Sequence, residues 1–110
     1  MPRESLGLVQ GTVDVLILRS LSRAPMHGYA VSQWILERSG GALAVEDAAL
    51  YQALHRLERK GWVEAEWGIF DTNRRVKTYQ ITPLGRKRLK ADIAELRRYV
   101  VALFSVLEPV

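Results

Sequence analysis

Apolar residues recur every three or four positions along the first half of the chain, a spacing typical of helices with one buried face. The first such segment begins near Gly11-Thr12 and is predicted to end at Ala24-Pro25, because proline disfavours helical geometry in the residue before it. The second runs from about Gly28 to Arg38, and Gly40-Gly41 is expected to stop it. The inner positions of these two helices are Val13, Leu16, Ile17, Leu21, Val31, Trp34 and Ile35.

A third helix is predicted after the short apolar link formed by residues 43–45. Asp47 is expected to be its N-cap, since a carboxylate can accept a hydrogen bond from a free backbone N–H at a helix start. Gly61 suits the left-handed position that follows a helix C-terminus. One face of this helix is apolar and carries Leu50, Ala53, Leu54 and Leu57.

After the third helix the hydrophobic period changes from about 3.6 to two. Residues 63–67 alternate between apolar and acidic side chains, which predicts a half-buried strand. Residues 68–73 hold turn formers, and residues 75–81 have the pattern of a returning strand. Thr82 is then expected to be the N-cap of a last helix, with Pro83 at its first position.

The predicted order is three helices, a hairpin and a long helix, so the fold class is mostly α with a small β-hairpin. This is the order of a winged helix-turn-helix, here followed by an extra C-terminal helix. We expect residues 1–82 to form the winged helix-turn-helix domain and residues 83–110 to form the C-terminal helix. Winged helices serve either DNA recognition or protein interaction, and the fold alone does not choose between them.

Charge is distributed unevenly along the chain. Residues 1–51 have a net charge of −1, whereas residues 52–98 have a net charge of +6. A concentrated positive field is expected where a protein meets a polyanion such as DNA. The alternative is a basic surface that only keeps the protein soluble.

Several function classes find no support in the sequence. The chain has no cysteine, which excludes disulfides and thiolate metal sites, and His27 and His55 alone do not indicate a zinc site. No glycine-rich phosphate loop or nucleophile–base pair is visible, so we expect no enzyme, cofactor or metal. No signal-peptide pattern is present, and the longest apolar stretch, residues 99–107, is too short to span a bilayer. We therefore expect a cytoplasmic protein.

The outer face of the third helix has the composition of a DNA-reading surface. Glutamine can pair with adenine, arginine with guanine or phosphate, and alanine methyl groups with the thymine methyl. A helical projection gives this face no acidic residue, since Glu58 projects sideways. A solvated helix face is the alternative. The face carries Ala48, Gln52, His55 and Arg59, with Ala49 and Arg56 beside them.

The hairpin concentrates cations at its tip and along its returning strand. Arg75 and Lys77 are two positions apart and therefore project to one face, with Arg74 next to them. Such a wing can lie along phosphates or enter a minor groove. An ordinary hairpin that is kept soluble by edge-strand charges is the alternative.

Apolar residues of the last helix are separated alternately by four and three positions, the spacing of a coiled-coil seam. A domain this small is not expected to cover such a face, so a second copy of the chain is the simplest cover. The alternative is that the helix folds back on its own domain. Residues 86–88 place three cations in the first helical turn, where phosphate contact or plain solvation would account for them. The expected dimer contacts are Leu89, Ile93, Leu96, Val100, Leu103, Phe104 and Leu107.

Six stretches of the sequence point to one known family: residues 11–18, Pro25-Met26-His27-Gly28-Tyr29, residues 50–58, Gly61-Trp62-Val63, Trp67-Gly68 and residues 74–86. In their order and their gaps, these stretches resemble the PadR family of bacterial transcriptional regulators. The resemblance covers roughly residues 6–90 and implies a winged-helix repressor that dimerises through its C-terminal helix and is released from DNA by a ligand or signal. The family commonly has Gly-Ser before the Leu-Tyr pair and Pro after it, where this chain has Ala48, Ala49 and Gln52, a difference that concerns base reading.

We therefore expect a dimeric repressor that binds an inverted-repeat DNA operator, with a winged-helix protein-interaction module as the alternative. A small aromatic effector is a further candidate partner. Five aromatic residues are candidates for its pocket at the dimer interface, although ordinary core packing is favoured for them: Trp34, Trp62, Trp67, Tyr99 and Phe104. The expected DNA contacts are Ala48, Ala49, Tyr51, Gln52, His55, Arg56, Arg59, Arg74, Arg75 and Lys77.

Overall fold

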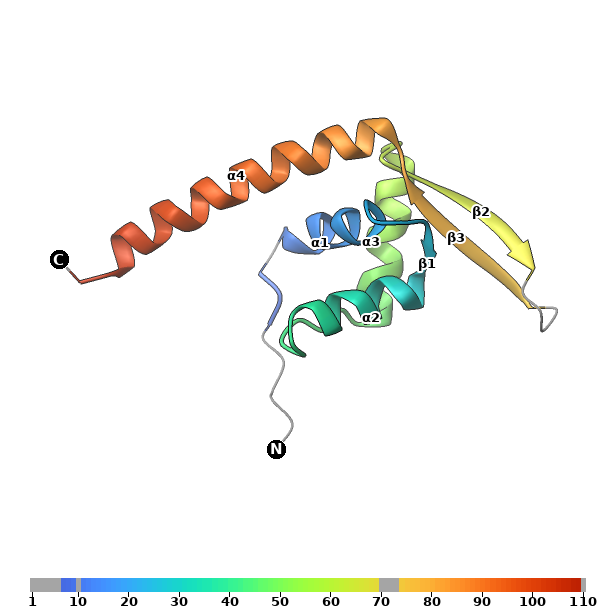
Figure 1. Ribbon diagram of the computed structural model, residues 1–110, viewed down its shortest axis with the longest axis horizontal. Coiled ribbons are helices and arrows are strands. Elements are labelled where there is room, and N and C mark those ends of the chain that lie inside the picture. The colour runs from blue at the N-terminus through green and yellow to red at the C-terminus, as the bar shows by residue number, and fades with distance from the viewer. Residues whose placement is uncertain (1–6, 10, 70–73, 110) are drawn as a thin grey trace.

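The computed structural model describes residues 7–9, 11–69 and 74–109 and has the expected order of helices and hairpin (Figure 1). Four helices and the two hairpin strands were predicted, and all are present. The short strand before the second helix was not predicted. The elements are α1 (Thr12–Leu21), β1 (Met26–His27), α2 (Gly28–Arg38), α3 (Asp47–Arg59), β2 (Val63–Ile69), β3 (Arg75–Ile81) and α4 (Pro83–Leu107).

The three strands form an antiparallel sheet in the order β1-β3-β2. The hairpin register pairs Val63 with Ile81 at its base and Ile69 with Arg75 near its tip. On the other edge of β3, Met26 pairs with Tyr79. This second pairing fastens the link between α1 and α2 to the hairpin, so the sheet sets where the wing stands relative to α2.

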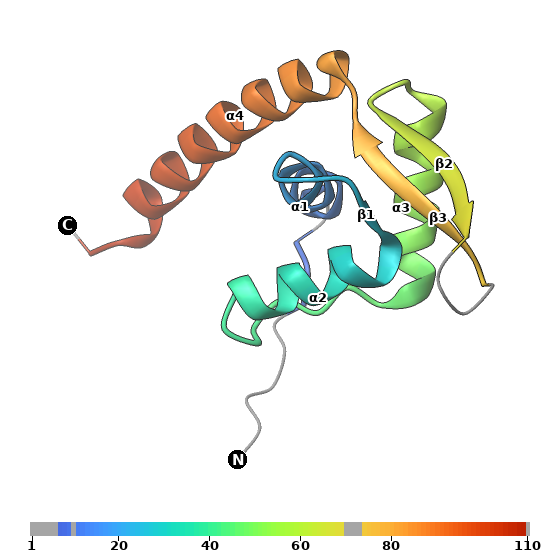
Figure 2. The same cartoon turned by 45° about the vertical axis from the view of Figure 1, so that its right-hand side comes forward.

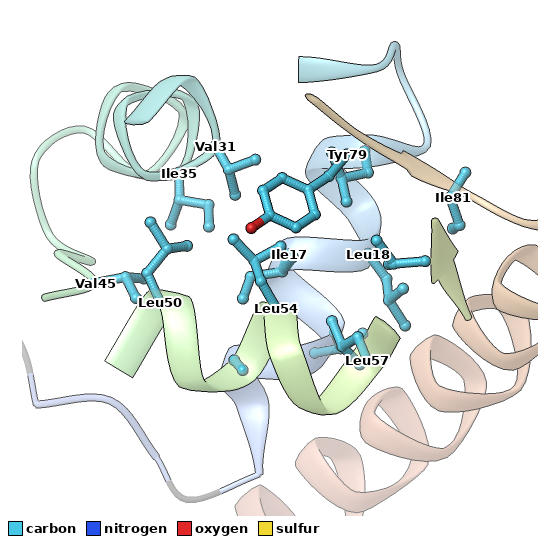
Figure 3. Packing of buried hydrophobic residues seen from close by; sticks show 14 of the residues in the cluster. Ile17, Leu18, Val31, Ile35, Val45, Leu50, Leu54, Leu57, Tyr79 and Ile81 are labelled. Atoms are coloured by element: carbon cyan, nitrogen blue, oxygen red, sulfur yellow. The ribbon is translucent and has the colours of Figure 1, made fainter. Parts of the chain in front are cut away.

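The hydrophobic core lies around α1, which contacts α2, α3, α4 and β3. Figure 2 shows α1 end-on between the other three helices. Completely buried aliphatic side chains from α1, α2 and α3 meet there, and Tyr79 and Ile81 close the core from the sheet (Figure 3). Because each fully buried aliphatic side chain contributes about 1.5–3 kcal/mol, this cluster supplies the main force that holds the helices together.

Two of the predicted helix starts are confirmed in detail. The Thr82 hydroxyl accepts a hydrogen bond from the Gly85 backbone N–H at 3.0 Å and donates one to the Gly61 carbonyl at 2.7 Å. Pro83 occupies the first position of α4, as expected. His27 begins α2, since its Nδ1 accepts a hydrogen bond from the Ala30 backbone N–H at 3.2 Å.

The start of α3 differs from the prediction. The N-cap is Glu46, whose side chain makes no capping bond, and Asp47 is the first helical residue. The predicted N-cap at Asp47 is therefore wrong by one position. The carboxylate of Asp47 still lies in the first turn, where the helix dipole favours a negative charge.

The long helix α4 is divided between its own domain and solvent. Leu89 is only 6% exposed and belongs to the core, and Ile93 packs against that core. The helix then leaves the domain (Figure 1), so that Leu96 and Leu103 are 37% and 38% exposed. The alternative, in which this helix folds back on its own domain, therefore holds only for the first part of α4. Among the described residues, no helix has the length and apolar character that crossing a membrane requires.

Candidate nucleic-acid interface

The outer face of α3 is solvent-exposed along its whole length. The inner face buries four apolar residues in the core, so the exposed face is held rigidly by the packing behind it. The predicted division of this helix into two faces is confirmed. The exposed residues on the outer side are Ala48, Ala49, Tyr51, Gln52, His55 and Arg59.

Arg56, beside this outer face, is half-buried and forms an ion pair with Asp14. Its Nε and Nη2 atoms donate hydrogen bonds to the two carboxylate oxygens of Asp14 on α1, at 3.3 and 2.5 Å. The hydrogen bond to Asp14 raises the pKa of Arg56 above its ordinary value, against a smaller opposing effect of burial. The guanidinium group of Arg56 thus joins α3 to α1, and the expected DNA contact of Arg56 stays a prediction.

The register of the hairpin gives it two chemically different faces. Cross-strand neighbours share a face, so Trp67 stands opposite Lys77 and Ile69 stands opposite Arg75 on one side. The opposite side carries Glu64 and Glu66, paired with Gln80 and Thr78. The cationic and aromatic face continues outward from the buried base of the hairpin, whereas the acidic face looks the other way.

Aromatic rings and one carboxylate hold the cations of the wing in place. The Trp67 ring lies 4.8 Å from the Arg75 guanidinium carbon and 5.8 Å from the Lys77 ammonium nitrogen. The Lys77 Nζ atom also lies 3.2 Å from Glu58 Oε1 on α3 and 5.4 Å from the Tyr79 ring. Lys77 therefore connects the wing to the reading helix. Arg74, the third predicted cation, is exposed.

A groove of about 710 Å³ lies between the hairpin, the start of α2 and α3. Its lining holds three of the predicted site residues of the wing together with Tyr51 of α3, and it contains no carboxylate. The sequence alone gave no DNA-binding role to His27 and Tyr29, and it placed Trp67 only among the candidates for an effector pocket, although all three lie in the quoted family stretches. The groove is lined by His27, Gly28, Tyr29, Tyr51, Trp67, Arg74, Arg75, Val76, Lys77 and Tyr79.

The cations at the start of α4 make contacts within the protein. Arg86 donates a hydrogen bond to the Ser22 carbonyl oxygen at 3.2 Å. Arg88 forms an ion pair with Asp92 and lies 4.9 Å from the Trp62 ring. These contacts explain two of the three cations without phosphate.

The five aromatic residues considered for an effector pocket do not line one common cavity of the single chain. Trp34 lies in a hollow between α1 and α2, and Trp62 and Tyr99 lie in another between α1 and α4. Trp67 lines the groove beside the wing. No group of three or more histidine, aspartate or glutamate side chains within residues 7–9, 11–69 and 74–109 could hold a metal ion.

An exposed helix face beside a cationic hairpin, on three packed helices, is the architecture of a winged-helix transcriptional regulator. The model of the "Transcriptional regulator PadR-like family" matches residues 17–91, and the chain belongs to that family. An uncharacterized protein of Lysinibacillus sphaericus is 33% identical over 88 residues, which cover 80% of this chain and 81% of that protein.

Solved structures share the fold. A transcriptional regulator from Clostridium thermocellum superposes with a TM-score of 0.83 at 28% identity, covering 90% of this chain and 96% of the other. Bacillus subtilis PadR in complex with operator DNA gives a TM-score of 0.69 at 19% identity, covering 83% of this chain and 59% of that one. The family and the Clostridium thermocellum neighbour are transcriptional regulators, in agreement with the expectation that the chain is not an enzyme.

Proposed function

We propose that this protein is a sequence-specific DNA-binding repressor that acts as a dimer in the cytoplasm. The observation that carries the proposal is that two exposed surfaces lie next to each other. The exposed face of α3 and the cationic face of the hairpin adjoin each other and share the residues Tyr51, Lys77 and Tyr79 in the hollows between them. A helix of this kind fits a major groove, and a cationic wing beside it fits the flanking phosphates.

The assignment of roles follows from this geometry. Gln52 and His55 are proposed to read base edges, because they are exposed on the rigid helix and carry hydrogen-bonding groups. Arg74 and Arg75 are proposed to bind phosphates without regard to sequence. The Bacillus subtilis relative, whose fold is similar, was determined with its operator DNA, which supports DNA as the partner.

Dimerisation is proposed to occur through the part of α4 beyond Ile93. The apolar side chains there are exposed in the single chain, and a coiled-coil spacing places them on one side. In this proposal residues 1–82 bind DNA and residues 83–110 hold the dimer. The reduced set of proposed contacts is Leu96, Val100, Leu103, Phe104 and Leu107, since Leu89 and Ile93 already pack in the domain. Release by a ligand or signal remains a prediction.

Selection of binding sites from random double-stranded DNA tests the function and yields the operator. We expect one enriched motif for the wild-type protein. Gln52→Ala or His55→Ala should shift the preferred bases, whereas Arg75→Ala should weaken binding to all sequences alike. Absence of any enrichment, together with no measurable affinity for DNA, would favour the protein-interaction alternative.

A further inference from the structure

Two of the stretches that match the family contribute no residue to the proposed DNA contacts on α3 or among the wing cations. One is Pro25-Met26-His27-Gly28-Tyr29 at the start of α2, and the other is Trp67-Gly68 on β2. The two stretches are about forty positions apart in the sequence. Residues of both nevertheless line the groove between the wing, α2 and α3, namely His27, Gly28, Tyr29 and Trp67. The pairing of β1 with β3 brings them to the same place.

Close packing at Gly28 shapes the floor of this groove. A Cβ atom at Gly28 would lie 2.8 Å from the hydroxyl oxygen of Tyr51 and 2.9 Å from its Cε1 atom. The missing side chain therefore lets the Tyr51 ring lie across the start of α2. Tyr29 stacks beside this point on His27, with 6.5 Å between ring centroids, and is 64% exposed. Two phenol groups thus reach the groove from different helices.

The opposite wall of the groove is cationic and aromatic. Trp67 is 57% exposed and contacts the charged ends of Arg75 and Lys77. Since no described residue lining the groove is acidic, its charge suits an anion. The groove also adjoins the hollow over the outer face of α3, because Tyr51, Lys77 and Tyr79 line both. The one carboxylate in that hollow, Glu58, is paired with Lys77. An anionic chain that lies on α3 can therefore continue into the groove.

We propose that this groove holds the sugar–phosphate backbone of one DNA strand, and that Tyr29 and Trp67 are DNA contacts in addition to the wing cations. The phenol of Tyr29 donates a hydrogen bond to a phosphate oxygen, a contact that tyrosine commonly makes with DNA. The exposed indole of Trp67 packs against deoxyribose while it keeps Arg75 and Lys77 on the groove side. The inference rests on the proposed function, because it names the seat of a DNA strand within that interface.

Fluorescence anisotropy with the selected operator tests the two contacts. Tyr29→Phe should weaken binding about tenfold or more, the effect of one lost hydrogen bond to a charged phosphate, and should leave the salt dependence unchanged. Arg75→Ala should instead lower the slope of log affinity against log salt by about 0.9. Trp67→Ala should weaken binding about tenfold, and Trp67→Phe should restore most of the loss by keeping an aromatic face. Gln80→Ala, on the acidic face of the same hairpin, should bind like the wild type.

The phosphate itself is located with operators that carry one uncharged methylphosphonate at successive positions. At the position that Tyr29 contacts, the affinities of wild type and Tyr29→Phe should differ less on the modified operator than on the unmodified one, because loss of the phosphate charge has already weakened the hydrogen bond. Binding of Tyr29→Phe and Trp67→Ala within twofold of wild type on every operator would overturn the inference and leave the groove to a smaller ligand. That result differs from failure of the proposed function, in which the wild-type protein itself would bind no DNA. Circular dichroism melting of each variant separates loss of contact from loss of folding.

Discussion

Tyr79 lies between the core and the groove. Its side chain is almost completely buried among core residues (Figure 3). Tyr79 also lines the groove, where the Lys77 Nζ atom lies 5.4 Å from the centre of its ring. Burial raises the pKa of the Tyr79 phenol above its ordinary value, and the nearby charge of Lys77 opposes this effect. The neutral phenol is therefore the form that the folded protein favours.

This raised pKa predicts a loss of stability in alkali. A group whose pKa is higher in the folded than in the unfolded state stabilises the fold below the unfolded value, about 10 for tyrosine. That contribution is lost as the pH rises through the folded value. Urea unfolding followed between pH 7 and 11 should show a free energy of unfolding that falls above about pH 10, and less steeply in Tyr79→Phe. Tyr29→Phe, at an exposed ring, is the control, and equal slopes for wild type and Tyr79→Phe would contradict the prediction.

Gly85 shows how closely α4 approaches the turn that follows α3. A Cβ atom there would lie 2.1 Å from the Trp62 carbonyl oxygen and 2.8 Å from Ile81 Cγ1. Since the oxygen belongs to the backbone, it cannot rotate away. Gly85→Ala should therefore lower the free energy of unfolding by about 1–3 kcal/mol or more, as overpacked sites do. Gly68→Ala, with no atom closer than 4.0 Å, should melt near the wild-type temperature. Thermal denaturation of both variants measures the difference, and an unchanged melting temperature for Gly85→Ala would refute it.

At the scale of elements, α4 changes its role along its length. Leu89 is part of the domain core, whereas Leu103, two heptads further on, is 38% exposed. The same apolar spacing thus serves intramolecular packing first and then leaves an uncovered face.

Substitutions at the two ends of α4 should therefore have different effects. Leu89→Ala should lower the free energy of unfolding by about 2–5 kcal/mol, the usual cost of a cavity in a core. Leu103→Glu should leave the domain folded and should abolish association, because it puts a charge into the proposed interface. Thermal melts and sedimentation equilibrium at micromolar concentration measure the two effects. If the wild-type protein sediments as a monomer, the proposal that it forms a dimer is wrong.

At the scale of the whole molecule, a two-fold dimer presents two reading helices and two wings. Its operator should be an inverted repeat, with half-sites about one DNA turn or a small multiple apart, because both helices enter the groove from one side. For about six phosphate contacts, log affinity should fall against log salt with a slope near −5. Anisotropy across a salt series, on the selected repeat and on one with its spacing changed by about half a turn, checks both properties. Indifference to spacing or a flat salt response would speak for the protein-interaction alternative.

Local patterns in the sequence were sufficient for most of the fold. The hydrophobic period gave the four helices and the hairpin, and Thr82-Pro83 marked the start of α4. These features depend on residues within a few positions of one another, so a sequence pattern contains them. The exposed face of α3 followed from the same reasoning, because the buried face of an amphipathic helix fixes the opposite one.

The tertiary structure alone decided the contacts between residues far apart in the sequence. Arg56 joins α3 to α1 because Asp14, 42 positions earlier in the sequence, lies next to it. Leu89 enters the core because the path of α4 crosses α1, which a heptad spacing does not encode. The two-residue strand β1 is too short to show a period, yet its pairing with β3 brings Tyr29 and Trp67 to one groove. Sequence thus determined the elements and their faces, and packing determined which faces meet.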